Sequence, residues 1–496
     1  MELNEPHQAA RPAQKEEAAE ISTEIPHETN DDDVDARLSE RRILLKCDLN
    51  LLPMLSLLFM CTILDRVNVA NARIQGLEKD LHMHGQDFNV VLFIFFILYI
   101  LLEVPANILI RRIRPSLFLS VVVFSFGVVT MCQGLTRSYA GLVVCRTILG
   151  GLEAGVYPGS IYLMTMFYKR HEFQWRLNIF YGSSLVTGAF SGLLAYAIAH
   201  MDGISGYSGW RWILIIEGLL TIAVAIPAYW ILPDWLETAK FLTEDERQFW
   251  ARRLASDTTH VEMNILNKQA VKRCFGDVKI WIAGFAYLCI LTSSYGSAYF
   301  LPTILFELGW TSTKAQVMTI PLYAVGTVVC LTCALISDHL KHRSSFVFGG
   351  CVVAIIAYAI LLSYFSVSVG VRYFALYLLQ SGLVVAQPGI VGWLSNNLGG
   401  HYKRGVGIAM QLSLGNIGGI IGSNIYLKSQ APTYHVGFGT GVGLLSAGAV
   451  ASCILLWYLR RENRLRDKGA RDHRYNLPES ELKNLGDDHP AFRFSY

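Results

Sequence analysis

Four ionisable side chains lie inside segments that are otherwise apolar. Asp65 and Arg66 interrupt the run LLPMLSLLFMCTILDRVNVA, and Arg146 and Glu153 interrupt YAGLVVCRTILGGLEAGVYPG. A charge near the centre of a bilayer costs roughly 3 kcal/mol or more on insertion scales, so such a residue usually faces a bundle interior or a water-filled cavity. Carboxylates and guanidinium groups in that setting carry protons and bind anions. The four residues therefore predict a transport path.

The composition requires a membrane setting for these residues. Of 496 residues, 52% are hydrophobic and only 16% are charged, which excludes an ordinary soluble protein of this size. Apolar runs long enough to cross a bilayer, roughly 20 residues each, recur about twelve times. We expect an all-α integral membrane fold with two six-helix halves, 43–232 and 279–460. A polar central loop, 233–278, joins them, and tails 1–42 and 461–496 flank them.

The distribution of Lys and Arg predicts the orientation of the spans. Short loops on one side of the predicted bundle hold most of these residues, and both tails add to the same side. The positive-inside rule then places both termini and the central loop in the cytosol. The first 40 or so residues are acidic and poor in apolar side chains, which predicts a disordered tail and no secretory signal. The net charge of +3 gives no indication of nucleic-acid binding.

Helical geometry predicts how the four charged residues are arranged. Arg146 and Glu153 are seven residues apart, so they share a helix face about 10 Å apart along the axis. Depth estimates place Asp65 and Arg146 at nearly the same level, where they can pair. Glu153 then lies deeper, and Arg66 points elsewhere as an uncompensated cation. In the alternative interpretation, all four form ion pairs that only fix helix packing.

The helix that carries Glu153 continues into a segment of small residues. Gly151, Gly155 and Gly159 repeat at every fourth position, a spacing that lets a neighbouring helix approach closely. Pro158 is able to kink the helix or free a carbonyl. These four residues predict a packing or gating element beside the charged group.

At the level of whole motifs, the chain resembles the major facilitator superfamily, and within it the fungal allantoate and nicotinate permease branch of the anion:cation symporter family. The resemblance covers roughly residues 43–460. It rests on the strings LDRVNVANA, EVPANILIRRIRPS, RTILGGLEAGVYPG, YKRHEFQWR, GWRWILIIEG and WLSNNLGGHYKRGVG.

The resemblance implies proton-driven uptake of a small organic anion by alternating access, in the plasma membrane. It implies that Glu153, with Asp65, serves in proton coupling and that Arg66 holds the carboxylate, while Asp65 and Arg146 form a gating pair. The segment NILIRRIRPS lacks the Gly-X-X-X-Asp-Arg pattern of the wider superfamily, whereas ISDHLKHR keeps Asp338 and Arg343. These two residues are candidates for contacts that lock one state.

Further polar residues in the second half are candidates for the substrate site, together with Arg146. Gln411 and Asn416 lie in a glycine-rich apolar run, where an amide either binds a substrate or joins helices. Tyr295 and Tyr299 either line a cavity or anchor a span at the interface.

Other functional classes fit the sequence less well. We find no nucleotide-binding glycine loop, no His-rich metal cluster and no nucleophile with a partner in the polar loops. We therefore expect no enzyme, no cofactor and no metal. An exporter of an organic acid or metabolite, and a nutrient sensor on the same fold, remain alternatives. The expected partners are a small organic anion, protons and the lipid bilayer, and the expected state is a monomer.

Overall fold

The computed structural model describes residues 31–110, 112–256, 273–340, 342–399, 401–478, 482 and 485–496. The chain divides into two units, Met1–Lys46 and Cys47–Tyr496, which we treat separately. In the first unit the described residues are the beginning of helix α2 (Asp31–Ala72). Residues 31–42, which the sequence analysis placed in a disordered tail, are thus helical.

The first half of the second unit contains residues 47–72 of α2 and the helices that follow it. In chain order these are η1 (Arg73–Leu77), α3 (Glu78–Asp80), α4 (Asp87–Ile110), α5 (Pro115–Leu135), α6 (Tyr139–Glu153), α7 (Val156–Phe167), α8 (Arg170–Ala199), η2 (Ile204–Gly206) and α9 (Gly209–Ile231). Two shorter helices, η3 (Leu236–Thr238) and α10 (Glu244–Ser256), then lie in the stretch predicted as a loop.

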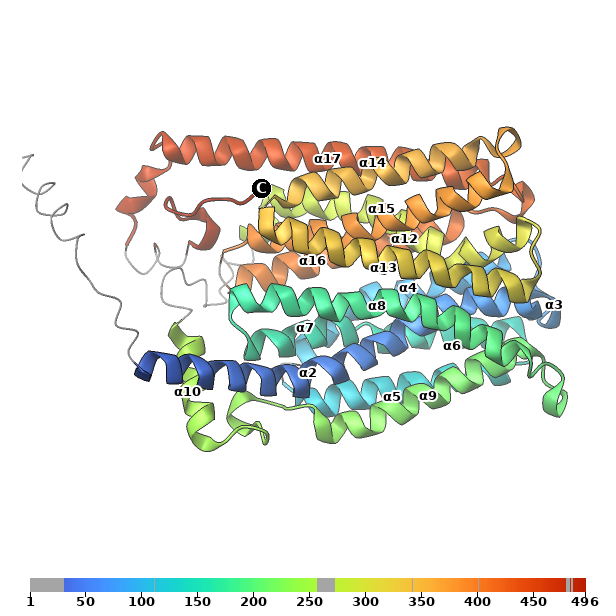
Figure 1. Cartoon of the computed structure of the whole chain (residues 1–496), viewed down its shortest axis with the longest axis horizontal. Coiled ribbons are helices and arrows are strands. Elements are labelled where there is room, and N and C mark those ends of the chain that lie inside the picture. The colour runs from blue at the N-terminus through green and yellow to red at the C-terminus, as the bar shows by residue number, and fades with distance from the viewer. Residues whose placement is uncertain are drawn as a thin grey trace, which may run out of the picture. The chain divides into compact units, whose positions relative to one another are not determined.

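The second half has the same kind of architecture (Figure 1). Its helices are α12 (Val278–Glu307), α13 (Ser312–Leu340), α14 (Arg343–Leu362), η4 (Tyr364–Ser366), α15 (Val369–Asn396), α16 (His401–Asn424), η5 (Lys428–Gln430), α17 (His435–Asp467), η6 (Asp472–Asn476) and η7 (Gly486–Asp488). Helix α17 therefore extends past residue 460, where the sequence predicted the last span to end.

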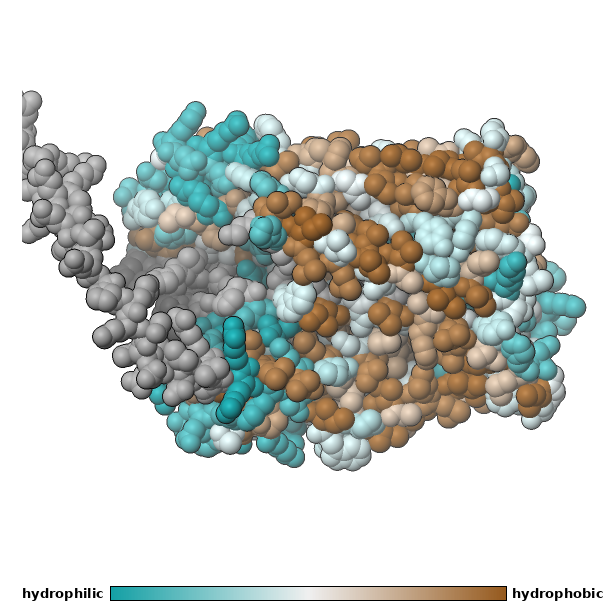
Figure 2. All heavy atoms as spheres, in the orientation of Figure 1, coloured by the Kyte–Doolittle hydropathy of each residue, from teal (hydrophilic) through white to brown (hydrophobic). Residues whose placement is uncertain are grey.

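The prediction of an all-α membrane fold is confirmed. Among the described residues there is no strand, and eleven helices are long and apolar enough to cross a membrane. Helix α4, 24 residues of largely apolar sequence, is a further long helix, and with it the count agrees with the predicted twelve. On the face that Figure 2 shows, hydrophobic residues gather over the middle of the long helices and hydrophilic residues at both ends.

The helices pack mainly within each half. Helix α5 packs on α9 and α4 on α6, while α14 packs on α15 and α12 on α16. Backbones approach closely where glycines face each other: a Cβ on Gly350 would lie 2.6 Å from the carbonyl oxygen of Gly382. Because lipid supplies no hydrophobic force between helices, such close packing is a main source of their association. Two helix pairs, α8 with α13 and α4 with α16, make the most extensive contacts between the halves.

The two ends of the bundle differ in what they carry. We call the end with α10 and residues 485–496 the tail end, and the end with η1, α3 and η5 the far end (Figure 1). Helix α10 is fixed to the first half at the tail end. The Trp250 indole donates to the carbonyl oxygen of Phe167 at 2.9 Å, and Arg253 pairs with Glu172 at 2.5 Å. The predicted central loop thus contains a docked helix, and residues 257–272 of it lie outside the described part.

Candidate functional site

A break in one membrane-spanning helix positions Glu153. Helix α6 ends at Glu153, and α7 begins at Val156. Pro158, in the first turn of α7, has no N–H to donate to the carbonyl of Ala154 and would crowd it in a continuous helix. The interruption therefore falls where the proline predicts it, and Glu153 is the last residue of α6.

The predicted glycines lie where this broken helix touches its neighbours. A Cβ at each would come within 3.0 Å of a side-chain carbon of α4 or α5: Leu102 for Gly151, Phe118 for Gly155 and Ile110 for Gly159. Gly150, which the sequence analysis did not single out, is closer still, because its Cβ would lie 1.9 Å from the carbonyl oxygen of Phe95. Small residues here let α6 and α7 pack against α4 and α5.

The four charged residues form two separate ion pairs. Arg146 Nη1 lies 2.6 Å from Asp65 Oδ2, and both side chains are almost fully buried. Arg66 Nη2 lies 2.5 Å from Glu153 Oε1. The first pair is the one expected from depth. The expectation that Arg66 is uncompensated is wrong, because its side chain reaches from α2 to Glu153 at the end of α6.

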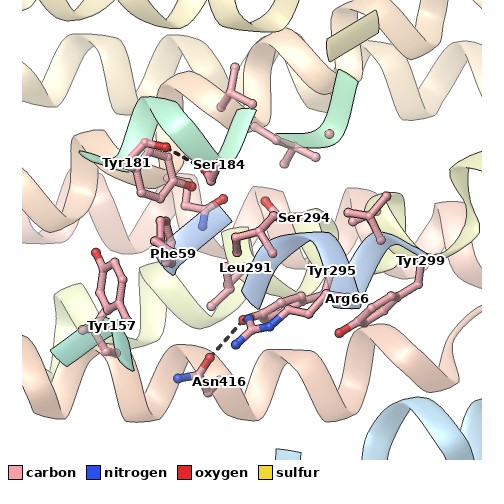
Figure 3. Close-up of a pocket in the computed structure, with 18 of the residues that line it drawn as sticks. Phe59, Arg66, Tyr157, Tyr181, Ser184, Leu291, Ser294, Tyr295, Tyr299 and Asn416 are labelled. Atoms are coloured by element: carbon pink, nitrogen blue, oxygen red, sulfur yellow. Dashed lines mark hydrogen bonds between the residues drawn. The ribbon is translucent and has the colours of Figure 1, made fainter. Parts of the chain in front are cut away.

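Arg66 also connects the two halves of the protein. Its Nη1 donates to the Tyr295 hydroxyl at 2.6 Å, and that hydroxyl donates to Asn416 Oδ1 at 3.1 Å (Figure 3). The rings of Phe95 and Tyr99 lie 5.2 Å from its Cζ, a distance that allows cation–π attraction. A cation of the first half is therefore held by groups of the second half.

A cavity of about 160 Å³ between the halves is lined by Arg66, Tyr99, Tyr295 and Asn416. Its walls are mostly aromatic and aliphatic, with polar groups from several helices. The polar and aromatic lining residues are Phe59, Arg66, Tyr99, Glu103, Glu153, Tyr157, Tyr181, Ser184, Tyr287, Ser294, Tyr295, Tyr299, Tyr323, Gln380, Gln387 and Asn416. A largely apolar wall with a few convergent polar groups is typical of a small-molecule site.

The predicted site residues divide into two groups. Arg66, Glu153, Tyr295, Tyr299 and Asn416 line the cavity. The ion pair of Asp65 and Arg146 lies apart from the cavity lining, and so does Gln411, whose amide faces the carbonyl oxygens of Ala283 and Ile390 at 3.5 and 3.4 Å. The arrangement of Gln411 corresponds to the helix-joining alternative.

The remaining candidates lie toward the tail end. Arg343 lines a smaller cavity of about 50 Å³, which shares Tyr181 with the central one. The side chain of Asp338 lies outside the described residues.

The sequence analysis missed three polar residues of the cavity, Glu103, Gln380 and Gln387. Glu103 could have been found, because it is a single ionisable residue in the apolar run of α4, and a charge in such a run is costly unless it has a function. Among the described residues, no group of His, Cys, Asp and Glu could hold a metal ion.

At the far end, polar contacts close the space between the halves. Glu78 lies 2.7 Å from Arg73 Nε and 2.6 Å from Lys428 Nζ, which belongs to the second half. Asn89 of α4 donates to the carbonyl oxygen of Ser423 in α16 at 2.6 Å. The cavity is therefore covered toward the far end.

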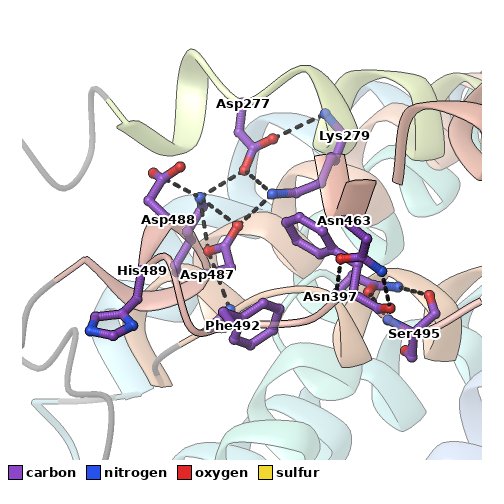
Figure 4. A network of polar contacts seen from close by, with 12 residues as sticks. Asp277, Lys279, Asn397, Asn463, Asp487, Asp488, His489, Phe492 and Ser495 are labelled. Atoms are coloured by element: carbon purple, nitrogen blue, oxygen red, sulfur yellow. Dashed lines mark hydrogen bonds and ion pairs between the residues drawn. The ribbon is translucent and has the colours of Figure 1, made fainter. Parts of the chain in front are cut away.

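A second polar network lies at the tail end and involves the C-terminal segment 485–496 (Figure 4). The carboxylate of Asp487 is bonded to the ammonium groups of Lys279, in the first turn of α12, and Lys403, in the first turn of α16. Arg466 of α17 donates to the carbonyl oxygens of Asp487 and Phe492 at 2.8 and 2.7 Å. The segment thus ties three helices together.

The last residues of the chain are held in the same way. Asn397 Nδ2 donates to the carbonyl oxygen of Ser495 at 2.9 Å, and its Oδ1 accepts from the backbone N–H of Ser495 at 2.8 Å. Asn463 makes the equivalent pair of bonds to the backbone of Phe494, whose ring is buried. The segment, which the sequence analysis assigned to the tail 461–496, is a packed element of the second half.

We expect Asp487→Asn to lower the free energy of unfolding by about 3 kcal/mol, since it removes one partner of buried ion pairs. Burial alone would raise the pKa of the Asp487 carboxyl, but the ammonium groups of Lys279 and Lys403 hold it below its usual range. This contribution is therefore present at neutral pH and is lost as the pH falls below about 4. Thermal unfolding of purified protein would measure both effects.

The neighbouring carboxylate supplies a matched control. Asp488 is about one third exposed and pairs with Arg474 at 3.2 Å. The Asp488→Asn change should cost less than about 1 kcal/mol. Equal losses for the two variants would contradict the anchoring role of Asp487.

Comparison with known proteins identifies the fold family. The model of the Major Facilitator Superfamily matches residues 55–423. The chain belongs to this superfamily. Its relatives include the MFS-type transporter cnsO of Penicillium expansum, 35% identical over 92% of this chain and 90% of the relative. The high-affinity nicotinic acid transporter of Saccharomyces cerevisiae is 29% identical over 96% of this chain and 90% of that protein.

A solved structure supports the same fold. The crystal structure of a bacterial homologue of the human lysosomal transporter Spinster, in an inward-facing and occupied conformation, has a TM-score of 0.62 to this facilitator. It covers 82% of this chain and 96% of its own, at 15% identity, so it bears on the fold alone. The family and the relatives are transporters. This chain is therefore a multi-pass membrane transporter and not an enzyme.

Proposed function

We propose that this transporter takes up a small organic anion together with protons by alternating access. The observation that carries the proposal is the Arg66–Glu153 pair in the central cavity, bonded to Tyr295 of the other half. A guanidinium presents paired donors that match a carboxylate. Protonation of Glu153 would release one of these donors to the anion.

The same pair explains how an empty carrier could change its conformation. With Glu153 ionised, the charge of Arg66 is compensated, so no net charge of this pair has to move through a low-dielectric interior. A proton and an anion arriving together replace that compensation: the proton neutralises Glu153, and the carboxylate takes its place beside Arg66. Release of both on the other side restores the pair.

The substrate class draws support from both the cavity and the relatives. The Saccharomyces relative is named as a nicotinic acid transporter, and the motifs around Arg66 and Glu153 resemble organic-anion symporters. Aromatic walls such as Tyr295 and Tyr299, stacked 5.9 Å apart, suit a flat anion. Export of an acidic metabolite is the second candidate, because the geometry is the same for either direction.

An uptake screen tests this proposal. Cells expressing the protein would be given labelled carboxylates, including nicotinate and allantoate, at acidic and at neutral outside pH. We expect at least one acid to accumulate faster at acidic pH and a protonophore to abolish the difference, while nicotinamide is not accumulated. Equal uptake of acid and amide would contradict an anion site, and accelerated loss of preloaded acid would favour export.

We further propose that the protein lies in the plasma membrane. Its tail end then faces the cytosol, as the distribution of Lys and Arg predicts. An epitope inserted at Gly203, in the exposed far-end loop before α9, should bind antibody on intact cells. The same epitope at Glu237, exposed in η3, should bind only after permeabilisation. Labelling of the Glu237 insertion on intact cells would overturn this topology.

A further inference from the structure

Glu103 is a second carboxylate in the central cavity. It is 1% exposed, and its Oε2 accepts a hydrogen bond from Ser413 Oγ at 3.0 Å. Glu103 belongs to α4 and Ser413 to α16, a helix pair that joins the halves. Among the residues that the structure describes, no cation lies within ion-pair distance of Glu103. The site thus contains one buried guanidinium and two buried carboxyl groups.

The charges of these groups limit what can bind. With both carboxyls ionised, Arg66, Glu153 and Glu103 sum to one negative charge, and a bound monoanion would raise this to two. Like charges confined in a low dielectric repel strongly. With both carboxyls protonated, the site carries one positive charge, which a monoanion neutralises. A neutral complex therefore requires a proton on each carboxyl group.

We propose that Glu103 is a second proton-binding site, filled together with Glu153 when the anion binds, so that two protons accompany each anion. The anion part of this inference rests on the proposed function. Besides Arg66 and Glu153, the titratable groups that line the cavity with Glu103 are phenols: Tyr99 on its own helix, Tyr157 from α7, Tyr181 from α8, Tyr287, Tyr295 and Tyr299 from α12, and Tyr323 from α13. Tyrosine hydroxyls stay neutral near pH 7, so protons exchange on the two carboxyls.

The two carboxyl groups have different tasks in this scheme. Glu153 compensates Arg66 when the carrier is empty. Glu103 forms no ion pair among the described residues, and we assign it the second proton that travels with the anion. A proton taken from one side binds the Glu103 carboxylate, crosses with the anion and is released to the other side, with no other bond made or broken. Loss of Glu103 should therefore lower the number of protons that accompany each anion from two to one.

The first experiment needs no substrate. Infrared difference spectra between mildly acidic and mildly alkaline pH would be recorded for protein in lipid nanodiscs. The wild type should gain carboxylic-acid C=O absorption on acidification, and Glu103→Gln should lose one component of it. Ser413→Ala keeps the carboxyl and should shift that component, because the hydrogen bond is gone. An unchanged spectrum for Glu103→Gln would overturn the proposal, whatever the substrate is.

The second experiment measures coupling in proteoliposomes with labelled nicotinate and the membrane potential held at zero. One pH unit drives accumulation up to about tenfold per coupled proton, so the limit is about 100-fold for two protons and about tenfold for one. The wild type should approach the first limit and Glu103→Gln the second. Equal limits would overturn the second proton. Absence of nicotinate uptake in the wild type, with the infrared result as expected, would instead count against the proposed function.

Discussion

The Glu153→Gln protein should lose accumulation driven by a pH gradient and still exchange labelled for unlabelled anion. Glutamine cannot form an ion pair with Arg66, so the empty carrier would leave this buried guanidinium without the carboxylate that it contacts at 2.5 Å. Removing one partner of a buried ion pair costs several kcal/mol. The loaded carrier is unaffected, because the anion supplies the missing charge. Net uptake should fall at least about 100-fold, since a cost of about 3 kcal/mol suffices for that, while exchange stays within a few-fold of the wild type.

Glu217 provides the control for this change. It is equally buried and accepts a hydrogen bond from Asn68 at 3.0 Å, but it does not line the cavity. Glu217→Gln should keep both net uptake and exchange. If Glu153→Gln still accumulates the anion in a pH-dependent way, Glu153 is not the coupling group.

Substitution of Arg66 by lysine should weaken uptake by about 100-fold with little effect on folding. Arg66 uses one Nη for Glu153 and the other for Tyr295, and a single ammonium cannot reproduce this planar pair of donors. Loss of a charge-assisted hydrogen bond costs about 1.5–3 kcal/mol, or roughly ten- to 150-fold in binding. The KM for the transported acid, measured in proteoliposomes that contain the purified protein, should rise.

A lysine substitution at Arg146 is the control that distinguishes a role in anion binding from a general need for a buried arginine. It pairs with Asp65 away from the cavity, so Arg146→Lys should reduce the amount of folded protein and leave the KM nearly unchanged. A normal KM for Arg66→Lys would remove the anion assignment and favour a neutral solute.

The fold was predictable from sequence because span length and apolarity are local properties. The Asp65–Arg146 pair was predictable for a similar reason: depth follows from counting residues along each helix. Where the prediction failed, the contact depends on how helices rotate against one another. Arg66 and Glu153 lie 87 residues apart, and nothing in either helix alone shows that they meet.

The C-terminal segment shows the same limit. Asp487 and Lys279 are separated by 208 residues, and the segment has no apolar periodicity that would indicate packing. The segment is held by individual polar side chains, and composition alone predicts that such side chains are exposed to solvent. Glu103 is a different case, since its position in the apolar run of α4 was visible in the sequence and its importance became clear only when the cavity placed it with Arg66.

The measurement that most directly tests the central proposal records internal pH and labelled anion together in vesicles that contain the purified protein. In the wild type, inward anion movement should acidify the interior, and an imposed pH gradient should drive accumulation. The Glu153→Gln protein should show neither effect. Anion accumulation without proton entry in the wild type, or unchanged proton entry in the variant, would contradict coupling through the Arg66–Glu153 pair.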